Sequence, residues 1–153
     1  MNVANKPITN AKGDSKDSKN MSQIKTMNLY TKGSKRELTK DDYSKISQLI
    51  TNKLESIGGQ LRTSMSEEKI DLLKENSNVL EIIPSKYESF TYVDGSNTSY
   101  KIVYNKLFIL LSHDLGISND DNTIIITEDD NGFDVLKLRQ NSTKLSEILL
   151  DKR

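Results

Sequence analysis

Apolar residues are almost absent from the start of the chain and become periodic only further along. Between residues 1 and 20 only Val3, Ala4 and Ile8 are apolar, among lysine, asparagine, serine and aspartate. Such a segment buries too little surface to offset the entropy that it loses when it orders. We therefore expect the beginning of the chain to be disordered.

Four apolar residues follow at spacings of three, which suits one weak helical turn or a docking strand but also a continued linker. They are Met21, Ile24, Met27 and Tyr30. Because the pattern is sparse, we favour the linker. The sequence thus predicts a disordered basic tail or spacer over residues 1–36 and a single domain over residues 37–153.

The first regular period predicts a helix that opens this domain. Its apolar residues recur at spacings of three or four, as one face of a helix requires; they are Tyr43, Ile46, Ile50, Leu54 and Ile57. Thr39 can cap the first turn, and Gly58-Gly59 can end the helix in a left-handed conformation. A second, shorter helix is expected from the capping-box pair Ser64 and Glu67 to the helix-breaking residues 76–78.

After residue 78 the period changes to two, which predicts β-strands. We expect them at Val79–Ile83, Tyr87–Val93, Ser99–Tyr104, Thr123–Glu128 and Phe133–Arg139. Leu107–Leu111 is a continuous apolar run that suits either a strand or a helix, and we favour a strand.

The last predicted hairpin can be assigned a register. A loop over residues 129–132 sets Ile126 opposite Val135 and Ile125 opposite Leu136. This is a better set of cross-strand pairs than a two-residue turn at Asn131-Gly132 would give.

The end of the chain predicts a short helix. Asn141 or Ser142 can cap it, and it carries Leu145, Ile148 and Leu149. The resulting fold class is α+β: two N-terminal helices followed by an antiparallel sheet of four or five strands and a short C-terminal helix, in two layers.

The net charge also differs between the predicted tail and the predicted domain. Residues 1–36 hold eight Lys or Arg and two acids, which gives +6, and residues 37–153 hold 14 basic and 20 acidic residues, which gives −6. The acidic domain repels a phosphate backbone, so we expect it not to bind nucleic acid, whereas the basic residues 1–36 suit peripheral contact with anionic lipid.

The longest apolar run, five residues, is too short for a transmembrane segment. The chain has no cysteine, which excludes disulfides and thiolate metal sites.

His113 is the only histidine, and Asp114 follows it. The two side chains could act as a general base with its orienting carboxylate. Adjacent residues on an extended chain point to opposite faces, however, so we favour a loop histidine over a catalytic one. No motif identifies a nucleophile, and we expect a protein that is not an enzyme and has no cofactor.

Six carboxylates within 15 residues could hold a hard cation such as calcium; they are Asp120, Asp121, Glu128, Asp129, Asp130 and Asp134. The EF-hand template fails, because with Gly132 at its sixth position the first and twelfth are Thr127 and Leu138. Solvated turns account for such residues, and we expect no specific metal site.

Aromatic residues gather between residues 87 and 108, and four of them are candidates for an exposed aromatic surface: Tyr87, Tyr92, Tyr100 and Tyr104. On neighbouring strands they could stack against bases or sugars. Core and cross-strand packing explains them equally well.

Two functions remain. The leading hypothesis is a non-enzymatic binding or assembly domain of a small bacterial cell-envelope protein, held by a flexible basic spacer with a reach of about 35 Å. In composition, residues 1–36 resemble the polar spacer that follows the lipid-modified cysteine in small lipoproteins of AT-rich bacteria. This resemblance implies an envelope or extracellular location if Met1 replaces a removed signal, with an unknown protein or envelope component as the partner. The alternative is a cytosolic partner-binding or regulatory protein, of mobile-element or phage origin, whose basic tail orders on binding.

Overall fold

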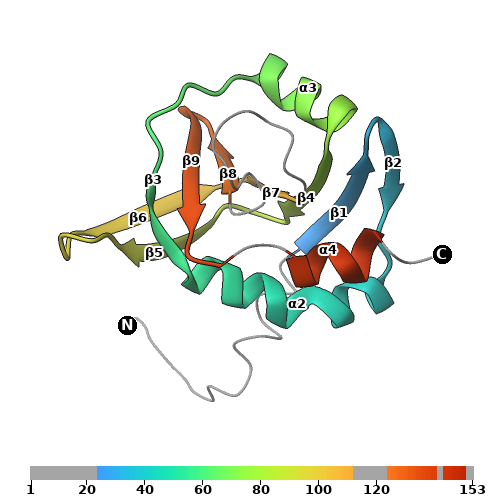
Figure 1. The fold of residues 1–153 in the computed structure, drawn as a ribbon, viewed down its shortest axis with the longest axis horizontal. Coiled ribbons are helices and arrows are strands. Elements are labelled where there is room, and N and C mark those ends of the chain that lie inside the picture. Colours follow the sequence, from blue (N-terminus) through green and yellow to red (C-terminus); the bar gives the residue numbers. More distant parts are fainter. Residues whose placement is uncertain (1–23, 112–123, 141–142, 151–153) are drawn as a thin grey trace.

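The computed structural model describes residues 24–111, 124–140 and 143–150. In these ranges it contains nine strands and three helices. Seven strands form one antiparallel sheet in the order β2-β1-β4-β7-β8-β9-β3, and β5 and β6 form a separate two-stranded ribbon (Figure 1). The strands of the large sheet are β1 (Ile24–Thr31), β2 (Ser34–Glu37), β3 (Ile57–Gln60), β4 (Asn78–Pro84), β7 (Lys106–Leu110), β8 (Ile124–Asp129) and β9 (Gly132–Leu138), and those of the ribbon are β5 (Glu88–Val93) and β6 (Ser99–Tyr104).

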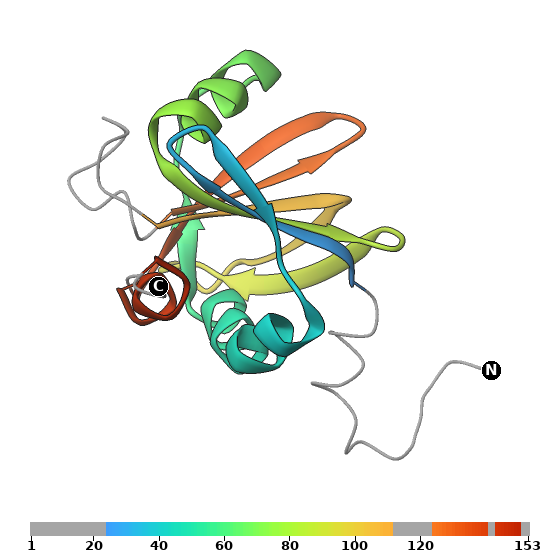
Figure 2. The same ribbon diagram turned by 90° about the vertical axis from the view of Figure 1, so that its right-hand side faces the viewer.

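The helices lie on both faces of the large sheet. Figures 1 and 2 show α2 (Lys40–Glu55) and α4 (Thr143–Leu150) on one face and α3 (Glu67–Asn76) on the other. The β5–β6 ribbon covers the same face as α2, because its buried side chains join the apolar cluster to which α2 contributes. The arrangement therefore has three layers.

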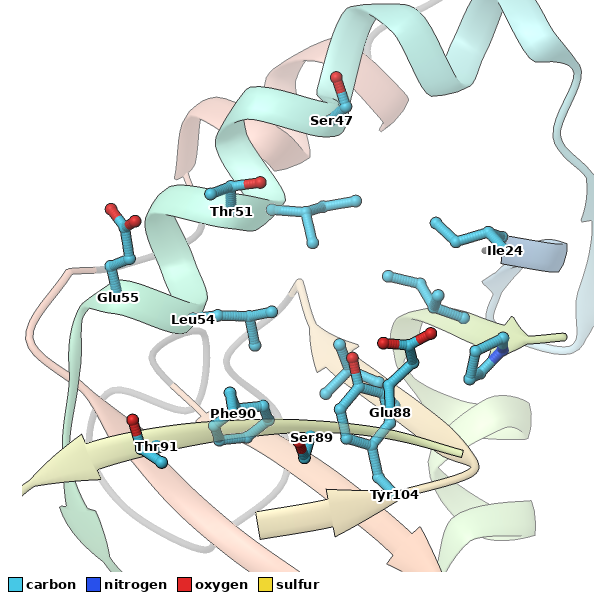
Figure 3. A pocket seen from close by; sticks show the side chains of 14 residues that line it. Ile24, Ser47, Thr51, Leu54, Glu55, Glu88, Ser89, Phe90, Thr91 and Tyr104 are labelled. Atoms are coloured by element: carbon cyan, nitrogen blue, oxygen red, sulfur yellow. The ribbon is translucent and has the colours of Figure 1, made fainter. Parts of the chain in front are cut away.

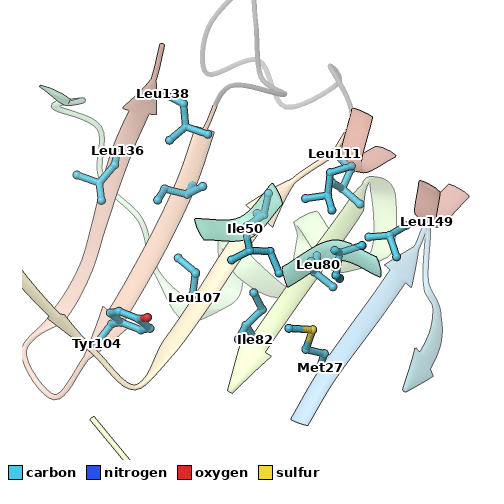
Figure 4. Close-up of a cluster of buried hydrophobic side chains, with 14 of the residues drawn as sticks. Met27, Ile50, Leu80, Ile82, Tyr104, Leu107, Leu111, Leu136, Leu138 and Leu149 are labelled. Carbon is cyan, nitrogen blue, oxygen red and sulfur yellow. The ribbon is translucent and has the colours of Figure 1, made fainter. Parts of the chain in front are cut away.

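The two apolar clusters follow from the alternation of side chains along the central strands. Leu107 and Ile109 point to the face that α2 and α4 cover, and Phe108 and Leu110 point to the face that α3 covers. Figure 4 shows the larger cluster, where Ile50 of α2 meets side chains of the sheet. A strand buried on both faces reads as a continuous apolar run, which explains why the period of residues 107–111 is ambiguous.

The predicted fold class is wrong in its order and in its layers. Two strands precede the first helix and a third separates α2 from α3, so the chain does not open with two helices. The large sheet has seven strands instead of four or five, and it carries helices on both faces. The prediction failed mainly because the first 36 residues were assigned to the tail.

Residues 24–36 belong to the folded body, which moves the predicted boundary at residue 37. Met27 and Leu29 point into the larger cluster, while the buried Asn28 points to the opposite face. The β1–β2 turn is also tied to the end of α3, where the backbone N–H of Lys32 donates to Ser77 O at 3.0 Å. Apolar alternation did not reveal β1, because Asn28 is a polar residue at a buried position, with a partner on β4.

Several single elements were predicted correctly. α2 begins after the N-cap Thr39, which forms a capping box with Asp42. Residues 107–110 lie in a strand, and the β8–β9 pairs are Ile126 with Val135 and Ile125 with Leu136. α4 is present, with Leu145 and Leu149 buried, whereas its predicted caps at residues 141 and 142 lie outside the described residues.

Two predicted helix ends need correction. The side chain of Ser66, and not that of Ser64, caps α3 by accepting from the Lys69 backbone N–H. α2 ends at Glu55, so Gly58 and Gly59 belong to β3 and have no positive φ. A Cβ at Gly58 would lie 3.3 Å from Arg139 Cγ, so a tight approach is the physical reason for a small residue there.

Candidate functional site

A largely apolar groove lies between α2 and β5, and we call it the α2–β5 groove (Figure 3). One wall is a single face of α2, and the other is a run of four consecutive β5 residues. Its volume is about 220 Å³. Its polar lining consists of Ser47, Thr51, Glu55, Glu88, Ser89 and Thr91, and its remaining lining of Ile24, Ile50, Leu54, Ile82, Pro84, Phe90, Tyr104 and Leu107.

The floor of the groove is apolar and rigid. Ile50, Ile82 and Leu107 are buried side chains of the larger core cluster, so they cannot move aside without disturbing the core. Phe90 and Tyr104 add an aromatic pair whose ring centroids lie 5.6 Å apart. An apolar group that entered the groove would therefore meet a preformed surface.

Consecutive β5 residues line the groove, although successive side chains of a strand point to opposite faces. A groove lined by all of residues 88–91 must run along the edge of the strand. The hydrogen bonds of the hairpin show which backbone groups lie at that edge: Asp94 N donates to Thr98 O at 3.1 Å, so these two residues form a hydrogen-bonded pair. Such pairs alternate along an antiparallel ladder.

Counting back by two residues on each strand makes Glu88, Phe90 and Tyr92 the β5 residues that bond to β6. The backbone N–H and C=O groups of Ser89 and Thr91 then point to the outer edge, into the groove. Val93 shares this phase, and its carbonyl accepts from Arg139 Nη2 at 3.5 Å, which agrees with an outward direction. The backbone groups of Ser89 and Thr91 have no partner among the residues that the structure describes.

The rim of the groove is negatively charged. Glu55 and Glu88 lie toward opposite ends of it, and its lining contains no basic residue. Burial raises the pKa of the Tyr104 hydroxyl to about 12, and the charge of Glu88 adds to this effect. Tyr104 is therefore a neutral part of the floor at physiological pH.

A second hollow of about 610 Å³ lies between residues 60–64 and the β5–β6 ribbon. It contains the stacked rings of Tyr92 and Tyr100, with centroids 5.1 Å apart. Its carboxylate, Asp94, is engaged locally: one oxygen accepts from Ser96 and the other from the Tyr100 hydroxyl. These hydrogen bonds, that of the Ser96 hydroxyl first, lower the pKa of Asp94. We assign Asp94 to the hairpin turn.

The four candidate tyrosines do not form one surface. Tyr92 and Tyr100 stack in the second hollow, and Tyr104 is buried in the floor of the α2–β5 groove. Tyr87 is exposed elsewhere and donates its hydroxyl hydrogen to Asp130. Of the four candidates, the structure therefore brings together only Tyr92 and Tyr100.

The described carboxylates of the acidic segment have separate partners. Asp129 accepts from the Asn131 backbone N–H at 2.9 Å, and Asp134 accepts from Gln60 Nε2 at 2.9 Å. Burial raises the pKa of Glu128. No group of three potential metal ligands occurs in residues 24–111, 124–140 and 143–150. Asp120, Asp121, His113 and Asp114 lie outside the described residues.

Apart from Tyr104, a candidate for the aromatic surface, the residues that line the groove were not singled out from the sequence as functional. Ile50 and Leu54 were identified only as part of a core-facing stripe, and Phe90 only as one of several aromatic residues. Periodicity shows which face of a strand is buried, but it does not show which backbone edge lacks a partner. Without that information, residues 88–91 look like an ordinary strand of the sheet.

Comparisons with protein-family models, with curated proteins and with solved structures found no match to this chain. No helix among the described residues is long and apolar enough to cross a membrane.

Proposed function

We propose that this chain is a non-enzymatic binding domain that holds a group of its partner in the α2–β5 groove. The observation that carries the proposal is an outward-facing strand edge beside a preformed apolar floor. Concave, largely apolar surfaces with a few placed polar groups are the usual form of a binding site.

The chemistry of the lining supports binding over catalysis. The groove offers hydroxyl groups, among them Ser47 and Thr51, and the carboxylates of Glu55 and Glu88. Among the described residues no hydrogen bond joins one of these hydroxyls to one of these carboxylates. An activated nucleophile needs such a contact with its base.

The envelope location of the leading hypothesis now rests on a shorter segment. Residues 1–23 hold four lysines and two aspartates, 4 − 2 = +2, and residues 24–153 hold 18 basic and 20 acidic residues, 18 − 20 = −2. We propose an envelope component as the partner on the composition of residues 1–23 alone. The cytosolic partner-binding or regulatory protein is the alternative.

The binding function can be tested by selecting displayed random peptides on the full-length chain. A variant with Leu54→Glu, which places a charge in the groove, serves for counter-selection, and Leu72→Glu on the exposed surface of α3 is its matched control. We expect peptides that are retained by the chain and by the Leu72 variant but lost by the Leu54 variant. If the melting temperature shows that the Leu54 variant is folded and every selected peptide still binds it, the proposed site is wrong.

A further inference from the structure

The α2–β5 groove has a shape that selects among classes of occupant. The four lining residues of β5 span about 13 Å, and the helix wall from Ser47 to Glu55 spans about 12 Å. Both walls therefore match an extended segment of about four residues. A helix does not fit this role, because its backbone groups are satisfied internally and cannot pair with the edge of β5.

The volume points in the same direction. Sites for drug-sized molecules usually measure about 300–1,000 Å³, which is more than the 220 Å³ of this groove. An apolar cavity of roughly 150 Å³ accommodates a benzene ring. The groove therefore has room for one large apolar side chain, or two small ones, of a longer partner.

We propose that the partner is an extended polypeptide segment that adds to the open edge of β5 as a third strand of the β5–β6 ribbon. Ser89 and Thr91 together offer two N–H groups and two C=O groups, enough for four backbone hydrogen bonds. The apolar side chains of the segment, at alternate positions, enter the floor beside Leu54 and Phe90. This inference rests on the proposed binding function.

Charge specifies the ends of the segment. Glu55 and Glu88 lie toward opposite ends of the groove, and neither forms an ion pair within the described part of the chain. Glu55 is also the last residue of α2, where the helix dipole carries partial negative charge. The geometry thus favours lysine or arginine on both sides of the apolar positions.

This inference is tested with a synthetic nine-residue peptide that has two lysines at each end. Between the lysines, apolar residues (valine or leucine) alternate with threonine. Binding to the full-length chain is measured by fluorescence anisotropy. We expect a peptide with glutamates in place of the lysines to bind about tenfold more weakly or worse. We expect the double variant Glu55→Lys/Glu88→Lys to reverse this preference, and the control Glu75→Lys on α3 to leave it unchanged.

Backbone methylation tests strand addition directly. Two further peptides carry N-methyl groups on every second residue, one in each phase, so that only one of them blocks the amides that would face β5. We expect one phase to lose about 30-fold in affinity, as two lost hydrogen bonds imply, and the other to bind normally. Equal loss or equal retention in the two phases overturns strand addition.

The outcomes separate the two proposals. If selected peptides depend on the groove but the phase of methylation has no effect, the binding function stands and strand addition is overturned. A lack of groove-dependent peptides overturns both. The chain's own residues 1–23 are a rival occupant for the test to examine, since Ile24, the next residue, lines the groove and residues 1–23 include four lysines. If replacing those lysines by glutamine tightens peptide binding more than about threefold, the groove is filled from within, and a separate partner is overturned.

Discussion

Replacing Lys74 by methionine removes the cation that pairs with the buried carboxylate of Glu81. Glu81 on β4 is 3% exposed and accepts hydrogen bonds from Lys74 Nζ at 3.0 Å and Asn28 Nδ2 at 2.9 Å. Lys74 also lies over the rings of Tyr30 and Phe108, at 4.7 and 5.5 Å from their centroids. Methionine keeps much of the apolar length of lysine, so the change isolates the charge.

The structure sets the size of the effect. Breaking a buried ion pair by removing one partner costs about 3–5 kcal/mol, because the remaining charge is left uncompensated. Asn28 still donates to Glu81 in the variant, which places the expected loss at about 3 kcal/mol, the lower end. For a domain of this size we expect a melting temperature about 12 °C lower.

The dependence on pH identifies the cause. Burial raises the pKa of Glu81, but the hydrogen bonds from Asn28 and Lys74 and the charge of Lys74 outweigh it, so the folded pKa lies below its usual value. Its stabilisation is therefore present above about pH 4.3, the unfolded value, and is lost as pH falls through the folded pKa. Without Lys74 we expect burial to prevail and the folded pKa of Glu81 to rise. The variant then loses stability as pH increases above about 4.3.

Urea unfolding of the wild type and the variant at about pH 4 and about pH 7 measures this difference. We expect the gap in unfolding free energy to be larger at pH 7 than at pH 4. The exposed Lys69→Met on the same helix is the control and should change stability by less than about 0.5 kcal/mol at either pH. A gap that is the same at both pH values would show that lost packing, and not the buried charge, causes the effect.

Three further changes have defined outcomes. Gly33→Ala should lower the unfolding free energy by about 1–2 kcal/mol, because Gly33 has a φ of +98°. Gly59 lies in open space without a positive φ, so Gly59→Ala should not lower it. Urea unfolding of both variants distinguishes backbone strain from the effect of added volume. Thr127→Val should raise the melting temperature by about 4 °C, because the buried Thr127 hydroxyl has no partner among the described residues, and an unchanged or lower temperature would contradict this. Because its pKa is raised to about 12, Tyr104 should stabilise the fold fully below about pH 10 and progressively less up to about pH 12. Tyr104→Phe should remove this loss of stability at alkaline pH, which checks the direction of the effect.

Elements with local signals could be predicted from the sequence. Thr39 and the stripe from Ile46 to Leu54 define α2, because a cap and a period of 3.6 are properties of neighbouring residues. The β8–β9 register followed from Ile126 and Val135, since a slip by one residue would turn the apolar side chains outward.

The sheet order could not be predicted, because it depends on contacts distant in sequence. Asn28 pairs with Glu81 across 53 positions, and this partner makes a polar residue suitable for the interior of a strand. The groove was missed for the same reason: residues 88–91 show which side chains face the core but not that β5 lies beneath α2. Only the packing of α2 against the sheet creates the site.

The way the chain treats its strand edges supports a role for β5. The four residues of β2, at one end of the large sheet, are exposed and include Lys35 and Arg36. β6 carries Lys101 near its centre. Charged residues, lysine above all, oppose unwanted pairing. The outward positions of β5 are Ser89, Thr91 and Val93, and none of them carries a charge. Because α2 lies over this edge, large sheets cannot approach it, whereas a single narrow strand can. An edge that is unprotected by charge but restricted by a helix is suited to one extended partner.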